Sequence, residues 1–154
     1  MTMLRRGLLA VIALGIAGAA FELATERHWQ NLQQLFPWAA LLLLSASWVM
    51  LALDRYHRAV APIALAVLAI SAFGIYAHLN ANHAAGFMDT SWESLSPLTQ
   101  WWYALTKSVG PAPPLAPGML AQSALLVWLL TAVRERVPVA SSHDEHHDDL
   151  PARS

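Results

Sequence analysis

The stretch PWAALLLLSASWVMLALDRYHRAVAPIALAVLAISAFGIYA, residues 37–77, decides the fold. Two apolar segments, 37–53 and 59–77, flank a short charged turn. Each is close to the roughly 20 residues that a helix needs to cross about 30 Å of hydrocarbon. In lipid, a span must satisfy its backbone polar groups internally, so both segments are predicted to be helices. The stretch therefore predicts two membrane-spanning helices joined by a tight turn.

Two further segments, 7–24 and 116–133, have the same apolar character. The chain is 56% hydrophobic and 12% charged, whereas a typical soluble domain is about 25% charged. We therefore predict an all-α integral membrane protein whose domain, residues 1–137, holds four transmembrane helices arranged as two antiparallel hairpins. The chain contains no cysteine, which excludes disulfides, thiolate metal sites and cysteine nucleophiles.

The arginines predict the orientation. Six of them flank one side of the predicted spans, namely Arg5, Arg6, Arg55, Arg58, Arg134 and Arg136. The opposite side has only Arg27 and Lys107. Because basic residues concentrate on the cytoplasmic side, this asymmetry predicts a multi-pass protein of the bacterial inner membrane with both termini in the cytoplasm. The charged turn, Asp54 to Arg58, is interpreted as a topological anchor.

The first segment has a second interpretation. MLRRGLLAVIALGIAGAAFE, residues 3–22, has a basic start, an apolar stretch and small residues at 17–20, which is also the pattern of a cleaved signal peptide. The charge rule leaves both interpretations open, because the second segment begins outside in either case. We expect a retained span, since the helical pattern continues into FELATERHW, residues 21–29.

The second outer loop, about 78–117, is predicted to contain an amphipathic helix over 97–109. Ser96 would be its N-cap, Pro97 its first residue and Gly110 its terminating residue. Its apolar positions fall on one face: Leu98, Trp101, Trp102, Leu105 and Val109. Tryptophans and a lysine suit the headgroup level, so Trp101, Trp102 and Lys107 are predicted to anchor the helix at the outer membrane interface.

Polar residues gather at the outer ends of the first and third segments. Glu22 and Glu26 are one helical turn apart and share a face. The candidate outward-facing cluster comprises Glu22, Glu26, His28, His78, Asn82 and His83. These residue types could hold a divalent metal such as zinc, nickel or copper(II), or share a proton. They could equally be a polar collar that joins the helices at the water interface.

The C-terminal tail, residues 138–154, is rich in histidine and acidic residues. It is predicted to be disordered and cytoplasmic, because it has too little apolar content to fold. His143, His146 and His147 are candidates for weak metal binding. A haem is not expected, although His28 and His78 could face one another, because neither lies inside its apolar segment.

Four motifs carry a resemblance. They are TERHW at 25–29, HLNAN at 78–82, TQWWYALT at 99–106 and PAPPLAPGML at 111–120. With them the chain resembles a group of small four-span bacterial inner-membrane proteins over about residues 20–130. The resemblance implies a four-helix membrane fold and a location, but no activity. The histidine-rich tail is not part of the pattern.

These observations favour a structural or accessory subunit of a membrane system. The alternative is a divalent-metal-binding or metal-transport accessory protein built around the outward-facing cluster. A membrane enzyme that uses Glu22 or Glu26 with His78 on a lipid or quinone is a third hypothesis, but no catalytic motif supports it. The expected partners are the lipid bilayer and either another membrane protein or further copies of the chain. Nucleic acid is not expected, since the chain has no basic patch.

Overall fold

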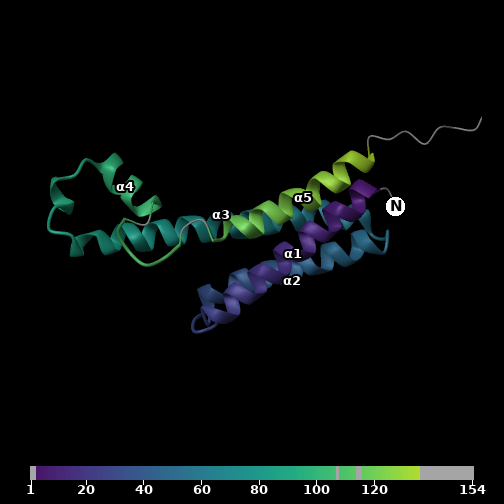
Figure 1. Ribbon diagram of the computed structural model, residues 1–154, viewed down its shortest axis with the longest axis horizontal. Helices are drawn as coiled ribbons and strands as arrows, with labels where there is room; N and C mark the ends of the chain where they lie inside the picture. The colour runs from purple at the N-terminus through teal and green to yellow at the C-terminus, as the bar shows by residue number, and fades with distance from the viewer. Residues whose placement is uncertain (1–2, 107, 114–115, 136–154) are drawn as a thin grey trace, which may run out of the picture.

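The computed structural model describes residues 3–106, 108–113 and 116–135, and over these residues it is helical without any strand (Figure 1). The main helices are α1 (Met3–Thr25), α2 (Phe36–Ala52), α3 (His57–Ala85), α4 (Pro97–Leu105) and α5 (Gly118–Glu135). Three short 3₁₀ helices, η1 (Leu32–Leu35), η2 (Gly86–Met88) and η3 (Trp92–Ser94), lie in the connections. The all-helical prediction is confirmed for the described residues.

Three helices are long and apolar enough to cross a membrane: α1, α2 together with η1, and α3 together with η2. The apolar part of α5, Gly118–Ala132, is shorter. The outer surfaces of the helices are also apolar, because Leu14, Phe21 and Leu42 are each more than 70% exposed. Aliphatic side chains spread over the outside of a bundle suit lipid rather than water. The fold is therefore compatible with a lipid bilayer.

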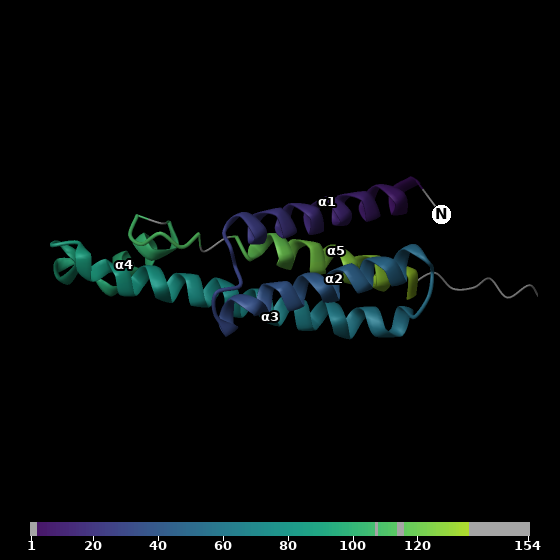
Figure 2. The same ribbon diagram turned by 90° about the horizontal axis from the view of Figure 1, so that it is seen from below.

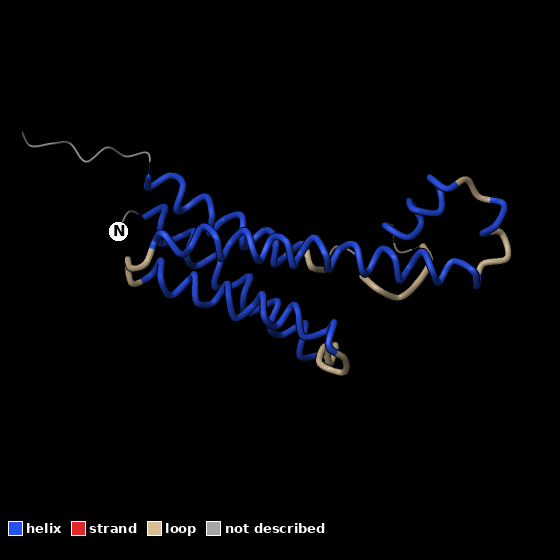
Figure 3. Tube along the Cα trace, turned by 180° about the vertical axis from the view of Figure 1, so that it is seen from behind, coloured by secondary structure: helices blue, strands red, loops and turns tan. Residues whose placement is uncertain are grey.

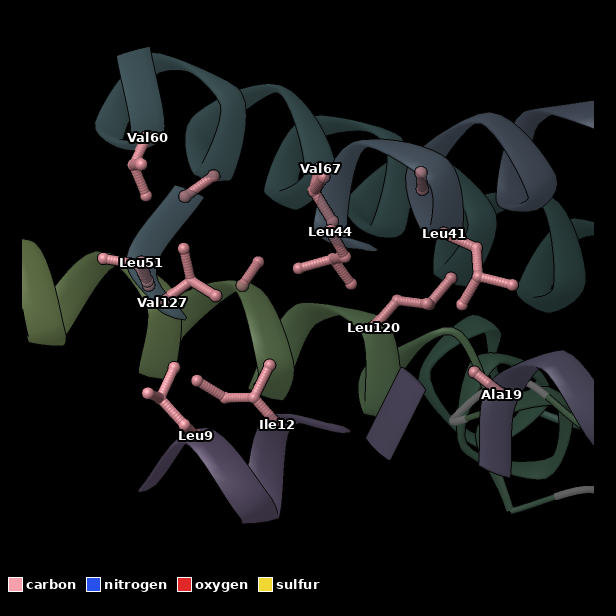
Figure 4. Close-up of a cluster of buried hydrophobic side chains, with 13 residues drawn as sticks. Leu9, Ile12, Ala19, Leu41, Leu44, Leu51, Val60, Val67, Leu120 and Val127 are labelled. Carbon is pink, nitrogen blue, oxygen red and sulfur yellow. The ribbon is translucent and has the colours of Figure 1, made fainter. Parts of the chain in front are cut away.

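The main core is an aliphatic cluster to which α1, α2, α3 and α5 all contribute (Figure 4). Ile12, Leu44, Val67 and Val127, one from each helix, are fully buried. Two close approaches tighten the bundle, because small residues let helix backbones come near each other. Gly15 faces the Ser123 side chain across α1 and α5, and Gly74 faces Pro117 across α3 and the start of α5.

One end of the bundle holds the start of α1, the α2–α3 turn and the end of α5 (Figure 1). We call it the arginine end. There the guanidinium of Arg5 donates to the Leu51 carbonyl at 2.6 Å and lies 2.8 Å from the Asp54 carboxylate. The His57 ring lies 3.4 Å from the same carboxylate. The predicted anchor is thus tied to α1 as well, through a partner, Arg5, that the charged turn alone did not identify.

The opposite end, the loop end, differs from the sequence prediction in two helices. α3 continues to Ala85, whereas its apolar segment stops at Ala77, so its last turns project beyond the α1–α2 loop (Figures 1 and 3). The residues HLNANHAA stay helical because alanine favours helices and because α4 packs on them. Hydropathy measured the apolar length of this helix and not its full length.

α4 begins as predicted, since Ser96 is its N-cap and the Ser96 hydroxyl accepts from the Thr99 N–H. It ends at Leu105 instead of residue 109, so Gly110 is not its terminating residue. Gly110 has a φ of +75° and turns the chain toward α3. α4 folds back along the projecting part of α3 and not across the ends of the other helices (Figure 2).

Candidate functional site

The loop end contains a cavity of about 490 Å³. Its walls come from the end of α1, residues in the segment 26–37, the middle and end of α3, and residues 111–113 and 116–117 before α5. The cavity exists because α5 begins before the loop end is reached. Its second residue, Met119, lies opposite Gly18, whereas α1 continues toward the loop end as far as Thr25. The first turn of α5 therefore forms the floor of the cavity, between α1 and α3, which both extend further toward the loop end.

Four of the six residues in the predicted cluster line this cavity: Glu22, Glu26, His28 and His78. Asn82 and His83 are not among its lining residues. The rings of His28 and His78 are near each other, with centroids 6.2 Å apart. The carboxylates of Glu22 and Glu26 form neither an ion pair nor a hydrogen bond with any residue in the described ranges.

His78 is oriented by the proline-rich segment and not by Glu22. Its Nδ1 lies 2.7 Å from the Pro113 carbonyl oxygen. A carbonyl oxygen only accepts, so Nδ1 carries the hydrogen and Nε2 is left as an acceptor in the neutral ring. His78 therefore adds an acceptor to a cavity that already contains two carboxylates. No lysine or arginine lies among the described lining residues.

The α3 wall of the cavity includes a polar atom that the sequence did not indicate. The Ser71 hydroxyl is buried, with the residue 1% exposed, and it has no hydrogen-bond partner within the described part of the chain. Helical serines usually bond back to a carbonyl one turn earlier, and most buried polar atoms have a partner. Its neighbours in the lining are apolar, among them Ile70 and Leu120. In the sequence Ser71 looked like any small residue in a span.

The rim is fixed by local hydrogen bonds. The Trp38 indole donates to the His28 carbonyl at 2.7 Å, which ties the start of α2 to the end of the α1 turn. Asn31 caps η1 by accepting from the Gln34 N–H at 3.0 Å. Gln34 in turn accepts from the Gln30 N–H at 2.7 Å. The mouth of the cavity is therefore built in advance rather than formed by long free loops.

Asn82 holds the outer segment onto α3. Its side-chain amide donates to the carbonyls of Ala104 and Ala112, at 3.0 and 2.7 Å, and its oxygen accepts from the Ala112 N–H at 3.0 Å. The residue is fully buried. Gly110 lies so close that a Cβ there would be 2.4 Å from the Asn82 side-chain oxygen. Asn82 is thus engaged in joining chain segments, and its amide is not available to a ligand.

His83 lies between two tryptophans. Its ring stacks on Trp101 with centroids 4.2 Å apart and meets Trp92 edge-on at 5.1 Å. Trp92 is buried, and its carbonyl accepts from the Gln100 side chain at 2.8 Å. Gly86 lets this indole approach, because a Cβ would lie 2.2 Å from a ring atom. The sequence signal for this second small core is Trp92, a large apolar residue in a polar loop six residues after Gly86.

The remaining predicted site residues divide into two groups. Trp101 and Trp102 are 42% and 59% exposed on α4 and face an apolar groove that Leu79, Leu98 and Leu105 also line. Lys107 and the tail residues His143, His146 and His147 lie outside the described residues.

Within the described ranges, no group of three or more histidine, cysteine, aspartate or glutamate side chains comes together to hold a metal ion.

The turn before η3 is fixed by Asp89. Its carboxylate accepts from the Ser91 hydroxyl at 2.7 Å and from the Ser91 N–H at 2.8 Å. These two hydrogen bonds, that from the hydroxyl first, lower the pKa of Asp89 below its usual value. Asp89 therefore belongs to the local structure of the loop.

Comparison of the chain with protein-family models, with curated proteins and with solved structures gives no match in any of the three. The resemblance noted in the sequence therefore stays a prediction.

Proposed function

We propose that the chain is a four-span protein of the bacterial inner membrane and that α5 is its fourth span. The support is its packing: α5 contributes Leu120, Ala124 and Val127 to the same core as the other three helices. Its 18 residues correspond to about 27 Å, close to the hydrocarbon thickness. Because Arg5, Arg55 and Arg58 sit at the arginine end, we assign that end, and both termini, to the cytoplasm.

Single cysteines test this topology, because the chain has none of its own. We expect that a membrane-impermeant maleimide added to intact spheroplasts labels Glu93→Cys and does not label Arg55→Cys or Ser154→Cys. All three variants should react after the membrane is opened, which controls for access. Labelling of Ser154→Cys in intact spheroplasts would show that α5 does not cross, or that the orientation is reversed.

We further propose that the protein is an accessory subunit that contacts a partner through the projecting part of α3. The observation that carries this proposal is the length of the helix: His57–Met88 has 32 residues, about 50 Å. Hydrocarbon plus one headgroup layer extends only about 37 Å. An average tilt of about 20° shortens the reach of the helix by about 3 Å. The far end would therefore stand outside the bilayer.

That far end is apolar. Phe87, Met88 and Leu98, which we call the tip, are 78%, 69% and 81% exposed. Large apolar side chains held above the headgroups are typical of a surface that another protein covers. The helices that carry the tip are held together, because the Asn82 hydrogen bond and the stacking of His83 on Trp101 fix α4 on α3. A surface built in advance loses less entropy on binding. We infer that the occupant is an apolar outer surface of another membrane protein.

Photocrosslinking tests the partner. We expect a benzophenone amino acid at Leu98 to give one discrete protein adduct in native membranes. The same group at Leu32 should give none, although Leu32 is 77% exposed at the same end of the bundle. The additional change Phe87→Glu should remove the Leu98 adduct and leave the melting temperature unchanged, because the tip is not part of the core.

Adducts of lipid size alone at Leu98 would place the tip in the bilayer and contradict the proposal. Equal adducts at Leu32 would show non-specific contact. The alternative of a metal-binding accessory has no support from the described side chains, since no ligand group forms among them.

A further inference from the structure

We propose that the loop-end cavity binds an organic ammonium ion that has an apolar body and a second hydrogen-bonding group, an amino-alcohol type of ligand. The cavity is separate from the tip, so this binding goes beyond the accessory role. Its volume of about 490 Å³ lies in the usual range for small-molecule sites, about 300–1,000 Å³.

The charge of the ligand follows from the lining. Glu22 and Glu26 both face the cavity, and no described residue pairs with either carboxylate. Carboxylates one helical turn apart repel each other, and a bound cation relieves that repulsion. In the neutral ring of His78, Nδ1 donates to the Pro113 carbonyl oxygen and Nε2 is a further acceptor. A set of acceptors without a lysine or arginine among the described lining residues favours a cationic hydrogen-bond donor.

The cation is organic rather than a metal ion. A metal needs several ligands converging at about 2 Å, and within the described ranges no such group of three exists. Below the glutamates the walls are apolar, with Ala19, Leu23, Ile70 and Leu120. These walls suit the hydrocarbon part of a ligand. An ammonium group accepts the looser geometry of two carboxylates, because it needs acceptors and not a fixed coordination polyhedron.

Ser71 is the reason for the second hydrogen-bonding group of the proposed ligand. Its hydroxyl is buried in the cavity lining and has no partner in the described chain. It can donate to, or accept from, a hydroxyl or carbonyl group of a ligand. A ligand that combines an ammonium group with such a group satisfies the glutamates and Ser71 together. An aliphatic amine would satisfy only the glutamates.

The test uses the full chain in phosphatidylcholine nanodiscs and equilibrium dialysis with tritiated N-octylethanolamine, subtracting empty nanodiscs. We expect saturable binding of one molecule per chain. 2-Octyloxyethanol, which has the same length and hydroxyl but no charge, should bind at least about 10-fold more weakly, as expected when a charge-assisted hydrogen bond is lost. This comparison needs no variant, so it holds whatever a substitution does to folding.

Two variants locate the site. The double change Glu22→Gln and Glu26→Gln should weaken N-octylethanolamine binding at least about 10-fold, while Glu93→Gln, an exposed acid outside the cavity, should not. Ser71→Ala should weaken it about 5-fold, the value of one hydrogen bond, and should leave octylamine binding unchanged. The octylamine result separates a missing ligand contact from a damaged fold.

A further experiment distinguishes two sources of the ammonium group, a lipid headgroup and a free amine. If phosphatidylethanolamine in the nanodisc lowers the apparent affinity for the probe, the natural ligand is a lipid headgroup. If it has no effect, the ligand is a free amine. Binding that does not saturate, equal binding of 2-octyloxyethanol, or undiminished binding by the double glutamine variant would each overturn the proposal.

Discussion

Replacing Asn82 with alanine is expected to release α4 and the segment before α5 from α3. The change leaves the carbonyls of Ala104 and Ala112 and the Ala112 N–H without the partner that the structure gives them. A buried polar group left unpaired costs about 1–3 kcal/mol. Since water reaches some of these groups once the segment opens, we expect a total loss of about 3 kcal/mol in the local free energy of opening.

Hydrogen exchange of the amides in 97–113 measures this loss directly. A cost of about 3 kcal/mol corresponds to exchange about 100-fold faster. Asn80→Ala is the matched control, because Asn80 lies two residues away on the same helix but is exposed. Asn82→Asp keeps the shape but places a buried carboxylate oxygen against the carbonyls of Ala104 and Ala112, so we expect it to speed exchange at least as much as Asn82→Ala. Unchanged protection in Asn82→Ala would show that the segment is held by other contacts.

Adding one methyl group at Gly86 is expected to disrupt the small aromatic core of the loop end. The Cβ of Gly86→Ala would lie 2.2–2.4 Å from three atoms of the Trp92 indole. Gly86 has a φ of −58°, which alanine adopts freely, so the effect is purely steric. Because Trp92 is buried and also contacts His83, the indole must move, at a cost of about 1–3 kcal/mol or more.

The measurement is fluorine NMR of protein labelled with fluorotryptophan. The chain has 7 tryptophans, and we expect the Trp92 resonance, assigned with Trp92→Phe, to shift and broaden in Gly86→Ala. Gly7→Ala is the control, since nothing lies within 4 Å of a Cβ at that position. A sharp, unshifted Trp92 resonance in Gly86→Ala would mean that the indole packs elsewhere.

The four bundle helices were predictable because each contains an apolar run, which is the pattern typical of helices compatible with lipid. Apolar runs identified all four bundle helices, and Ser96 with Pro97 identified the start of α4. The same rule failed for α3, whose last turns contain HLNANHAA. Those residues are polar and helical at once, because α3 continues beyond its apolar segment and packs there against α4. Hydropathy identifies the apolar part of a helix, whereas the full length of the helix also depends on tertiary packing.

The candidate site was predictable only as a set of residue types at one end. Glu22, Glu26, His28 and His78 do line a common cavity, and their spacing and depth gave that expectation. The role of Asn82 was not predictable, since its partners are backbone groups 22 and 30 residues away. Backbone groups have no sequence signature. Ser71 was missed for a similar reason, because only the fold shows which buried hydroxyl lacks a partner.

The two ends of the bundle are stabilised by different interactions, an ion pair at the arginine end and neutral hydrogen bonds at the loop end, and only the ion pair is sensitive to ionic strength. At the arginine end, Arg5 and Asp54 are joined by charge, with side chains 23% and 48% exposed. Mobile ions weaken such pairs, since the screening length falls to about 3 Å at 1 M salt. At the loop end, Asn82 works through neutral amide bonds in a buried place. We therefore expect concentrated salt to loosen the contact between α1 and the α2–α3 turn at the arginine end while α4 stays docked, so that one end of the bundle is salt-sensitive and the other salt-resistant.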